Sequence, residues 1–204
     1  MQTLGSGVRG VAKQARTVQL RPNPQLANMA ARAAHPLGWT IGVVGGGQLG
    51  RMMVDPAHRL GFKIAVLDPG GAQAAAAVMA DRVVAGGLKD GEKCRELAQG
   101  CDVVTLEIEH VNCEVLAELE REGVNVQPSA ESVRIIQDKL LQKQHFEAAG
   151  VAVPAFMDTP DADAVRAAAE KFGLPLCLKA RKGGYDGRGA LLSTCAATLT
   201  NAQH

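Results

Sequence analysis

The chain has 204 residues, of which 47% are apolar and 21% are charged; this composition supports one or two folded domains and excludes an intrinsically disordered polypeptide. It contains no run of about 18 uninterrupted apolar residues, so the sequence predicts no membrane-spanning helix. The net charge of +1, from 22 basic and 21 acidic residues, gives no global field that would attract nucleic acid or an anionic membrane.

Residues 1–38 differ from the rest of the chain in charge. This segment lacks Asp and Glu, and its basic residues are Arg9, Lys13, Arg16, Arg21 and Arg32. A basic, acid-free segment without a compact apolar stretch is typical of an organellar transit peptide rather than a secretory signal. We expect import into plastids, with mitochondria as the second destination. The alternative is a basic tail without targeting function, which would leave the protein in the cytosol.

The cysteines indicate a reducing compartment. There are five of them, an odd number without C-x-x-C or zinc-finger spacing: Cys94, Cys101, Cys113, Cys177 and Cys195. We therefore expect free thiols, as in the cytosol, the stroma or the mitochondrial matrix.

Residues 39–128 alternate between strand-like and helix-like segments. Apolar strand patterns occupy residues 39–44, 63–67, 82–84, 102–106 and 124–126. Helical spacing of apolar residues occurs between them, at 48–60, 90–99 and 113–122. This alternation predicts an α/β fold with a doubly wound parallel sheet.

The remaining residues predict a connector and the beginning of a second unit. Residues 129–150 have the spacing of one amphipathic helix, capped by Ser129. Residues 151–192 then predict an extended segment, a helix from about 160 to 172, a strand at 176–179, a glycine-rich loop and a short strand at 190–192. Residues 193–204 form a small, polar C-terminal tail.

A glycine turn follows the first strand. Gly45, Gly47 and Gly50 fit the G-x-G-x-x-G pattern, and Asp68 ends the second strand, where dinucleotide enzymes place a ribose-binding acid. The turn therefore predicts an anion site at a helix N-terminus, for the phosphate of NAD or of a sugar phosphate. A tight turn that binds no ligand is the alternative.

Two acids follow the strand at 102–106. Glu107 and Glu109 lie on the same side of an extended chain that leaves a parallel strand, where ligands of such sheets bind. We expect one of the two carboxylates to face the crevice. The alternative is a solvated strand end.

Lysines and glycines gather near the end of the sequence. Lys179 ends an apolar strand just before a loop that contains Gly183, Gly184, Tyr185, Asp186, Gly187, Arg188 and Gly189. This arrangement predicts a lysine that holds a phosphate, next to a flap that covers phosphates. A simple hairpin turn is the alternative. Lys139 and Lys143, spaced i, i+4 on the connector, are by default surface lysines.

These motifs, in this order, resemble one known family. Residues 45–52, 65–69, 102–109 and 137–139 with Lys143, followed by 178–179 and 183–189, resemble N5-carboxyaminoimidazole ribonucleotide synthase. This ATP-grasp enzyme of purine biosynthesis is, in fungi and plants, the N-terminal part of phosphoribosylaminoimidazole carboxylase. The resemblance spans residues 39–192. It implies a Rossmann-like pre-ATP-grasp domain at 39–128, a connector helix at 129–150 and a partial ATP-grasp domain at 151–192.

The resemblance also implies an activity. ATP would phosphorylate bicarbonate to carboxyphosphate, whose CO2 is captured by the exocyclic amine of aminoimidazole ribonucleotide (AIR). It implies an AIR site at Gln48, Leu49 and Glu107, with closure over AIR or the phosphates by Tyr185, Asp186 and Arg188. It implies ATP contacts from Lys139, Lys179, Gly183, Gly184, Gly187 and Gly189, and leaves the catalytic residues unassigned. In this interpretation Asp68 is structural.

The sequence departs from the family pattern after the glycine loop. Ala190 stands where the family has Gln, and residues 193–204 do not resemble the family's continuation, which would carry the Mg2+ ligands. The resemblance thus implies ATP and Mg2+ as cofactors, with no metal ligand in this chain, and predicts a partial chain that is inactive alone. A homodimer and a fused or separate carboxylase mutase domain are further expectations, with no nucleic-acid or membrane partner.

Two other functions are kept as alternatives. The first is a non-catalytic truncated paralogue or interaction module. The second is an NAD-dependent dehydrogenase, which is disfavoured because no acid–base constellation follows the first unit.

Overall fold

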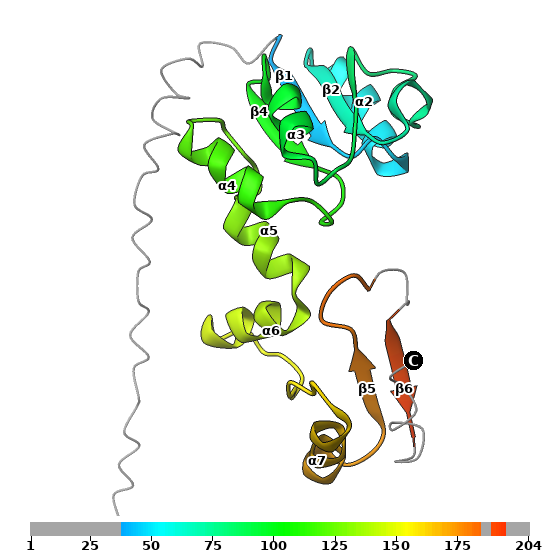
Figure 1. The fold of residues 1–204 in the computed structure, drawn as a ribbon, viewed down its shortest axis with the longest axis vertical. Coiled ribbons are helices and arrows are strands. Elements are labelled where there is room, and N and C mark those ends of the chain that lie inside the picture. Colours follow the sequence, from blue (N-terminus) through cyan, green and yellow to red (C-terminus); the bar gives the residue numbers. More distant parts are fainter. Residues whose placement is uncertain (1–37, 185–188, 195–204) are drawn as a thin grey trace, which may run out of the picture. The chain divides into compact units, whose positions relative to one another are not determined.

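A computed structural model describes residues 38–184 and 189–194 (Figure 1). Residues 1–37 of the predicted targeting segment therefore lie outside the described residues, as do Tyr185, Asp186, Gly187 and Arg188. The first elements are β1 (Thr40–Val44), α2 (Gln48–Arg59), β2 (Lys63–Asp68), the 3-10 turn η1 (Gly71–Gln73), β3 (Arg82–Ala85), α3 (Gly91–Ala98), β4 (Val103–Leu106), α4 (Cys113–Arg121) and α5 (Ala130–Gln137). They are followed by α6 (Lys139–Ala148), α7 (Ala162–Phe172), β5 (Leu176–Lys179) and β6 (Ala190–Ser193).

The first four strands form one parallel sheet, which confirms the predicted fold class. Their order is β3-β2-β1-β4, so β1 lies in the interior of the sheet. Alternate β1 residues face opposite layers: Val43 packs in a cluster with Val54 of α2, whereas Val44 packs with Leu97 of α3 and Leu116 of α4. Helices therefore cover both faces, as a doubly wound sheet requires. The expected strand at 124–126 is reduced to a single parallel bridge between Val104 and Val126.

The connector consists of two helices where the sequence predicts one. Ser129 caps α5 as expected, its hydroxyl accepting the Ser132 N–H at 3.2 Å. At Asp138 the backbone leaves the helical region, with φ −119° and ψ 109°. Its carboxylate accepts the N–H groups of Leu140 and Leu141 at 3.0 and 3.3 Å, so Asp138 ends α5 and starts α6.

After α6 the described chain adds the helix α7 and a two-stranded sheet. α7 begins at Ala162, two residues after the predicted start, because Asp161 acts as its N-cap and accepts the Ala164 N–H at 2.8 Å. β5 and β6 pair antiparallel, with Lys179 opposite Ala190.

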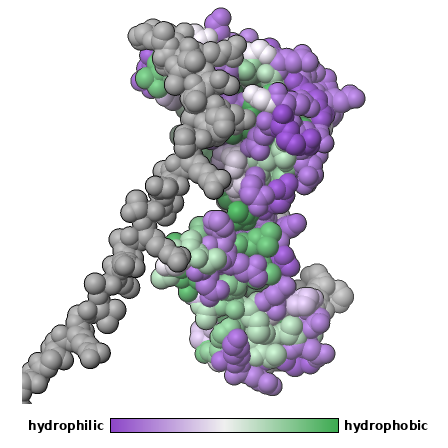
Figure 2. Space-filling model, turned by 90° about the vertical axis from the view of Figure 1, so that its left-hand side faces the viewer, coloured by the Kyte–Doolittle hydropathy of each residue, from purple (hydrophilic) through white to green (hydrophobic). Residues whose placement is uncertain are grey.

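Apolar side chains remain exposed around these later helices. Figure 2 shows green, apolar surface gathered over the lower part of the molecule, which carries α6 and α7. Among the described residues from 136 to 194, the exposed large apolar ones are Ile136, Leu141, Phe146, Val151, Leu174 and Leu192. Among the described residues no helix is both long and apolar enough to span a bilayer.

Candidate functional site

The glycine turn lies at the carboxyl end of β1 and is closed by an acid from β2. Gly45 adopts φ +108°, a backbone conformation that residues other than glycine rarely take. The Gly46 N–H donates to Asp68 Oδ2 at 3.0 Å, and Oδ1 of the same carboxylate accepts the Gly70 N–H at 2.7 Å. Asp68 thus fastens the turn to the loop after β2, which supports the structural role implied by the resemblance.

A second acid, Glu107, caps the helix that begins at this turn. Gly47 is the N-cap residue of α2 and has no side chain to satisfy the free N–H groups of the first turn. The Glu107 carboxylate, just after β4, accepts the Gly47 N–H through Oε1 at 2.8 Å and the Gly50 N–H through Oε2. Gly47 is the N-cap of α2 and Gly50 is its third helical residue. In a capping box, side chains of the helix itself accept hydrogen bonds from these two N–H groups. Here the side chain of a distant glutamate accepts both.

The glycines of the motif make room for this carboxylate. A Cβ atom at Gly45 would lie 2.4 Å from Glu107 Cγ, and one at Gly47 or Gly50 would lie 2.7 Å from a Glu107 carboxylate oxygen. Two of the N–H groups that would face a pyrophosphate in a dinucleotide enzyme are thus already bonded to an internal anion. This arrangement does not support the NAD-dependent alternative.

The three residues predicted to contact AIR lie together at this turn. Gln48 and Leu49 are exposed at the start of α2, and Leu49 keeps 60% of its surface accessible. Glu107 is half-buried beside them. Each of its carboxylate oxygens has a second lone pair that can accept a hydrogen bond from a ligand. Glu109 lies apart from the turn, with its Oε1 at 3.7 Å from Nε2 of the neighbouring His110.

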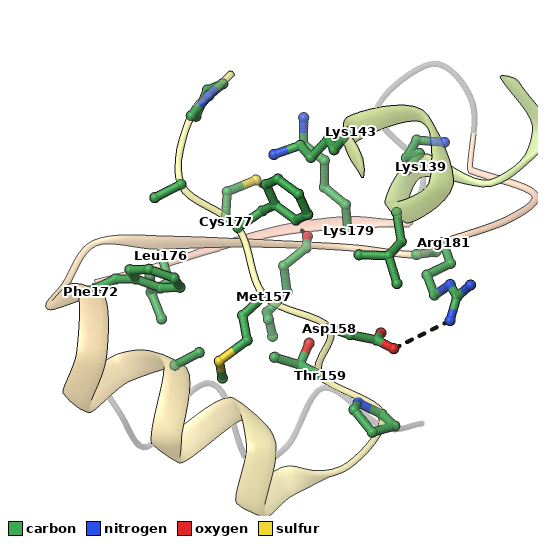
Figure 3. A pocket seen from close by; sticks show the side chains of 18 of the residues that line it. Lys139, Lys143, Met157, Asp158, Thr159, Phe172, Leu176, Cys177, Lys179 and Arg181 are labelled. Atoms are coloured by element: carbon green, nitrogen blue, oxygen red, sulfur yellow. Dashed lines mark hydrogen bonds and ion pairs between the residues drawn. The ribbon is translucent and has the colours of Figure 1, made fainter. Parts of the chain in front are cut away.

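A second candidate site is a cavity of about 860 Å³ between α6, α7, β5 and the segment 154–160. Figure 3 shows Lys139 and Lys143 reaching it from α6, with Cys177 and Lys179 on β5. The other end is apolar, with Met157, Phe172 and Leu176 among its lining residues. A cavity with cationic groups at one end and apolar groups at the other suits a ligand with an anionic and an aromatic part.

The lysines of this cavity differ in their contacts. Lys139 Nζ donates to the Gly184 carbonyl oxygen at 3.1 Å, which ties it to the start of the glycine loop. Lys143, expected to be an ordinary surface lysine, lines the cavity with its Nζ 5.2 Å from the centre of the Phe156 ring. Lys179 is exposed at the end of β5. Gly183 and Gly189 adopt φ +75° and +74°, which favours glycine at both ends of the loop.

An ion pair that the sequence did not predict lies at the edge of this cavity. Asp138, only 2% exposed, accepts Nε–H and Nη2–H of Arg181 at 3.1 and 2.7 Å, and Arg181 Nη1 lies 3.4 Å from Asp158 Oδ2. The hydrogen bond from Arg181 holds the pKa of the Asp138 carboxyl below its usual value. An aspartate inside an otherwise continuous helical pattern was the available signal, since aspartate is a preferred N-cap. Its arginine partner lies 43 residues away.

The described residues contain no cluster of metal-ligating side chains. No group of three or more His, Cys, Asp and Glu side chains lies close enough together, within residues 38–184 and 189–194, to hold a metal ion.

Comparisons with known proteins match both parts of the chain. The ribonucleotide synthetase preATP-grasp domain matches residues 38–137, and the ATP-grasp domain matches residues 144–203. Phosphoribosylaminoimidazole carboxylase of Schizosaccharomyces pombe is 42% identical over 149 residues, which are 73% of this chain and 27% of that protein. The crystal structure of N5-carboxyaminoimidazole synthase from Aspergillus clavatus, in complex with ADP and 5-aminoimidazole ribonucleotide, aligns with a TM-score of 0.69 at 35% identity over 79% of this chain and 42% of that chain.

The chain belongs to the N5-carboxyaminoimidazole ribonucleotide synthase family. A third relative, from Vigna aconitifolia, is named as the chloroplastic phosphoribosylaminoimidazole carboxylase and is 39% identical over 162 residues, 79% of this chain and 28% of that protein. The chain therefore spans less than a third of these two curated relatives. Within this family the glycine turn belongs to the preATP-grasp domain, and β5, α7 and the glycine loop belong to the ATP-grasp domain.

Proposed function

We propose that this chain supplies the AIR-binding turn and part of the ATP-binding cavity for the ATP- and bicarbonate-dependent carboxylation of 5-aminoimidazole ribonucleotide. The observation that carries the proposal is the cavity in which Lys139 and Lys179 converge beside the glycine loop, in a chain of this family. In the reaction, ATP transfers its γ-phosphoryl group to bicarbonate, which gives ADP and carboxyphosphate. Loss of phosphate then releases CO2, which the exocyclic amine of AIR captures.

Each group of residues has a separate task in this proposal. The ammonium groups of Lys139 and Lys179 neutralise ATP phosphates, and the glycines of the loop allow its backbone to approach them. Gln48 and Leu49 contact AIR at the start of α2, and Glu107 accepts from donor groups of AIR while it holds the turn. Tyr185, Asp186 and Arg188, which lie outside the described residues, close over AIR or the phosphates. Mg2+, which the family implies, is not assigned to any described residue.

Calorimetric titration of the 204-residue chain with ATP tests the cavity. Lys179→Ala should weaken ATP binding by about tenfold, because a charge-assisted contact contributes roughly 1.5 to 3 kcal/mol and this lysine is exposed. Lys171→Ala removes the same charge from α7 at a residue that does not line the cavity, and should leave the affinity unchanged. Equal affinities for the two variants would refute the assignment.

Titration with AIR tests the turn. Gln48→Ala should lower the affinity for AIR and leave that for ATP unchanged, because Gln48 is exposed at the glycine turn and does not line the cavity. An equal loss for both ligands, or no loss for AIR, would contradict the assignment.

The basic segment 1–38 is proposed to direct import into plastids. Its acid-free composition and the chloroplastic relative support this proposal. Fused to a fluorescent protein, the segment should label plastids, and a variant with its five basic residues replaced by Gln should not. A cytosolic signal from the unchanged segment would refute the proposal.

A homodimer and a fused or separate mutase domain remain predictions. Light scattering of the purified chain tests whether it forms a homodimer.

A further inference from the structure

Polar contacts determine where Lys139 lies relative to the glycine loop. Lys139 is the first residue of α6, and that helix buries none of its residues. Apolar packing therefore contributes little to holding its first turn in place. Lys179, in contrast, is fixed by the pairing of β5 with β6.

Four hydrogen bonds join the start of α6 to the segment after β5. Two run from the Arg181 guanidinium to the Asp138 carboxylate, at 3.1 and 2.7 Å. The Lys139 N–H donates to the Arg181 carbonyl oxygen at 2.9 Å, and Lys139 Nζ donates to the Gly184 carbonyl oxygen at 3.1 Å. Asp138 Oδ1 also accepts the N–H groups that begin α6, so the carboxylate that orients the helix is the one that binds the arginine.

We propose that the Asp138–Arg181 pair is a positioning element of the nucleotide cavity. It holds the first turn of α6 against the chain that leaves β5 and thereby sets the position of the Lys139 ammonium relative to that of Lys179. A guanidinium and a carboxylate joined by two parallel hydrogen bonds fix an angle as well as a distance. Arg181 follows Lys179 by two residues, and both residues line the cavity (Figure 3). This inference rests on the proposed binding of ATP.

Two conservative variants separate positioning from stability. Asp138→Asn keeps an oxygen that can cap α6 but removes the charge, and Arg181→Lys keeps the charge but removes the planar fork. The matched controls are Glu118→Gln and Arg95→Lys, which alter an ion pair between α3 and α4 in the same ways. All four variants are compared by thermal melting, by ATP titration below their Tm, and by hydrogen exchange of the Lys139 amide without nucleotide.

The proposal predicts effects that follow the pair and not stability. Asp138→Asn and Arg181→Lys should each weaken ATP binding by about tenfold and accelerate exchange of the Lys139 amide by at least about tenfold. The two controls should leave both quantities within about twofold of the unsubstituted chain, whatever their Tm.

Each contrary result overturns a distinct statement. Unchanged ATP affinity in both pair variants would overturn the positioning role, even if their Tm falls. Failure of the unsubstituted chain to bind ATP would overturn the proposed function and, with it, a role of the pair in nucleotide binding. The Lys139 exchange rates would still test the contact itself, since rates equal to those of the controls would show that the pair does not hold α6.

Discussion

Replacing Glu107 with Ala should destabilise the chain through the first turn of α2. The substitution removes the acceptor of the Gly47 and Gly50 N–H groups. Loss of the cap at the partly exposed Gly47 costs about 1 kcal/mol. The Gly50 N–H, in a buried residue, loses its partner at a cost of roughly 1 to 3 kcal/mol. The expected loss is about 3 kcal/mol in the free energy of unfolding, or a fall in Tm of roughly 6 to 12 °C.

Urea denaturation followed by circular dichroism measures this loss, with Glu109→Ala as the matched control. Glu109 follows the same strand and lies 3.7 Å from the His110 ring, a partly exposed contact whose removal should cost less than about 0.5 kcal/mol. If the two variants unfold within about 0.5 kcal/mol of each other, Glu107 does not cap α2.

A double-mutant cycle isolates the contact between Glu107 and the glycine turn. Gly47 has φ −73°, which alanine can adopt, so the cost of Gly47→Ala comes chiefly from the 2.7 Å approach of its Cβ to Glu107 Oε1. In the Glu107→Ala background that cost should fall by about 1 kcal/mol. Additive costs would refute the steric explanation.

Three further predictions concern other parts of the chain. Burial raises the pKa of Cys94 to about 11, so only about one thousandth of this thiol is thiolate at pH 8. Cys177 is exposed and lines the cavity, so peptide mapping after alkylation should find it modified first among the described cysteines. ATP should protect Cys177 from alkylation. Arg181 lowers the pKa of Asp138, so Asp138→Asn should lower the free energy of unfolding by about 2 kcal/mol near pH 7. Urea titrations should show the difference between the two proteins shrinking as the pH falls below about 4, because the Asp138 carboxyl then becomes protonated. Arg82 donates to the carbonyl oxygens of Leu97 and Gln99 at the end of α3, at 2.5 and 2.9 Å, so Arg82→Met should lower the unfolding free energy by about 1 to 2 kcal/mol; no change would show that water replaces the guanidinium.

The sequence predicted those features that local patterns encode. Alternating strand and helix segments identified the parallel sheet, because apolar strands that are buried on both faces stand out between amphipathic helices. The glycine turn was found for a similar reason, since its spacing is local. What it binds was left open, because its partner Glu107 lies 57 to 60 residues away along the chain.

The break at Asp138 shows where periodicity fails. Val133, Ile136 and Leu140 continue at helical spacing across the break, so the apolar pattern predicts one helix. The carboxylate competes with the backbone for the N–H groups of the next turn and starts a new helix there. The contact with Arg181 stabilises this geometry and depends on the tertiary fold, so no local pattern contains it.

The fit between the glycine turn and Glu107 changes how this motif should be interpreted in other sequences. A search for G-x-G-x-x-G alone finds turns that bind the pyrophosphate of a cofactor together with turns that bind an acidic side chain of their own protein. In this chain the three glycines and the glutamate after β4 form one composite signature, since each Cβ added to the turn would collide with that side chain. In related sequences we expect the four positions to vary together, so that loss of the glutamate relaxes the requirement for glycine. The residue aligned with position 107 would then distinguish the two kinds of turn in proteins known only by sequence.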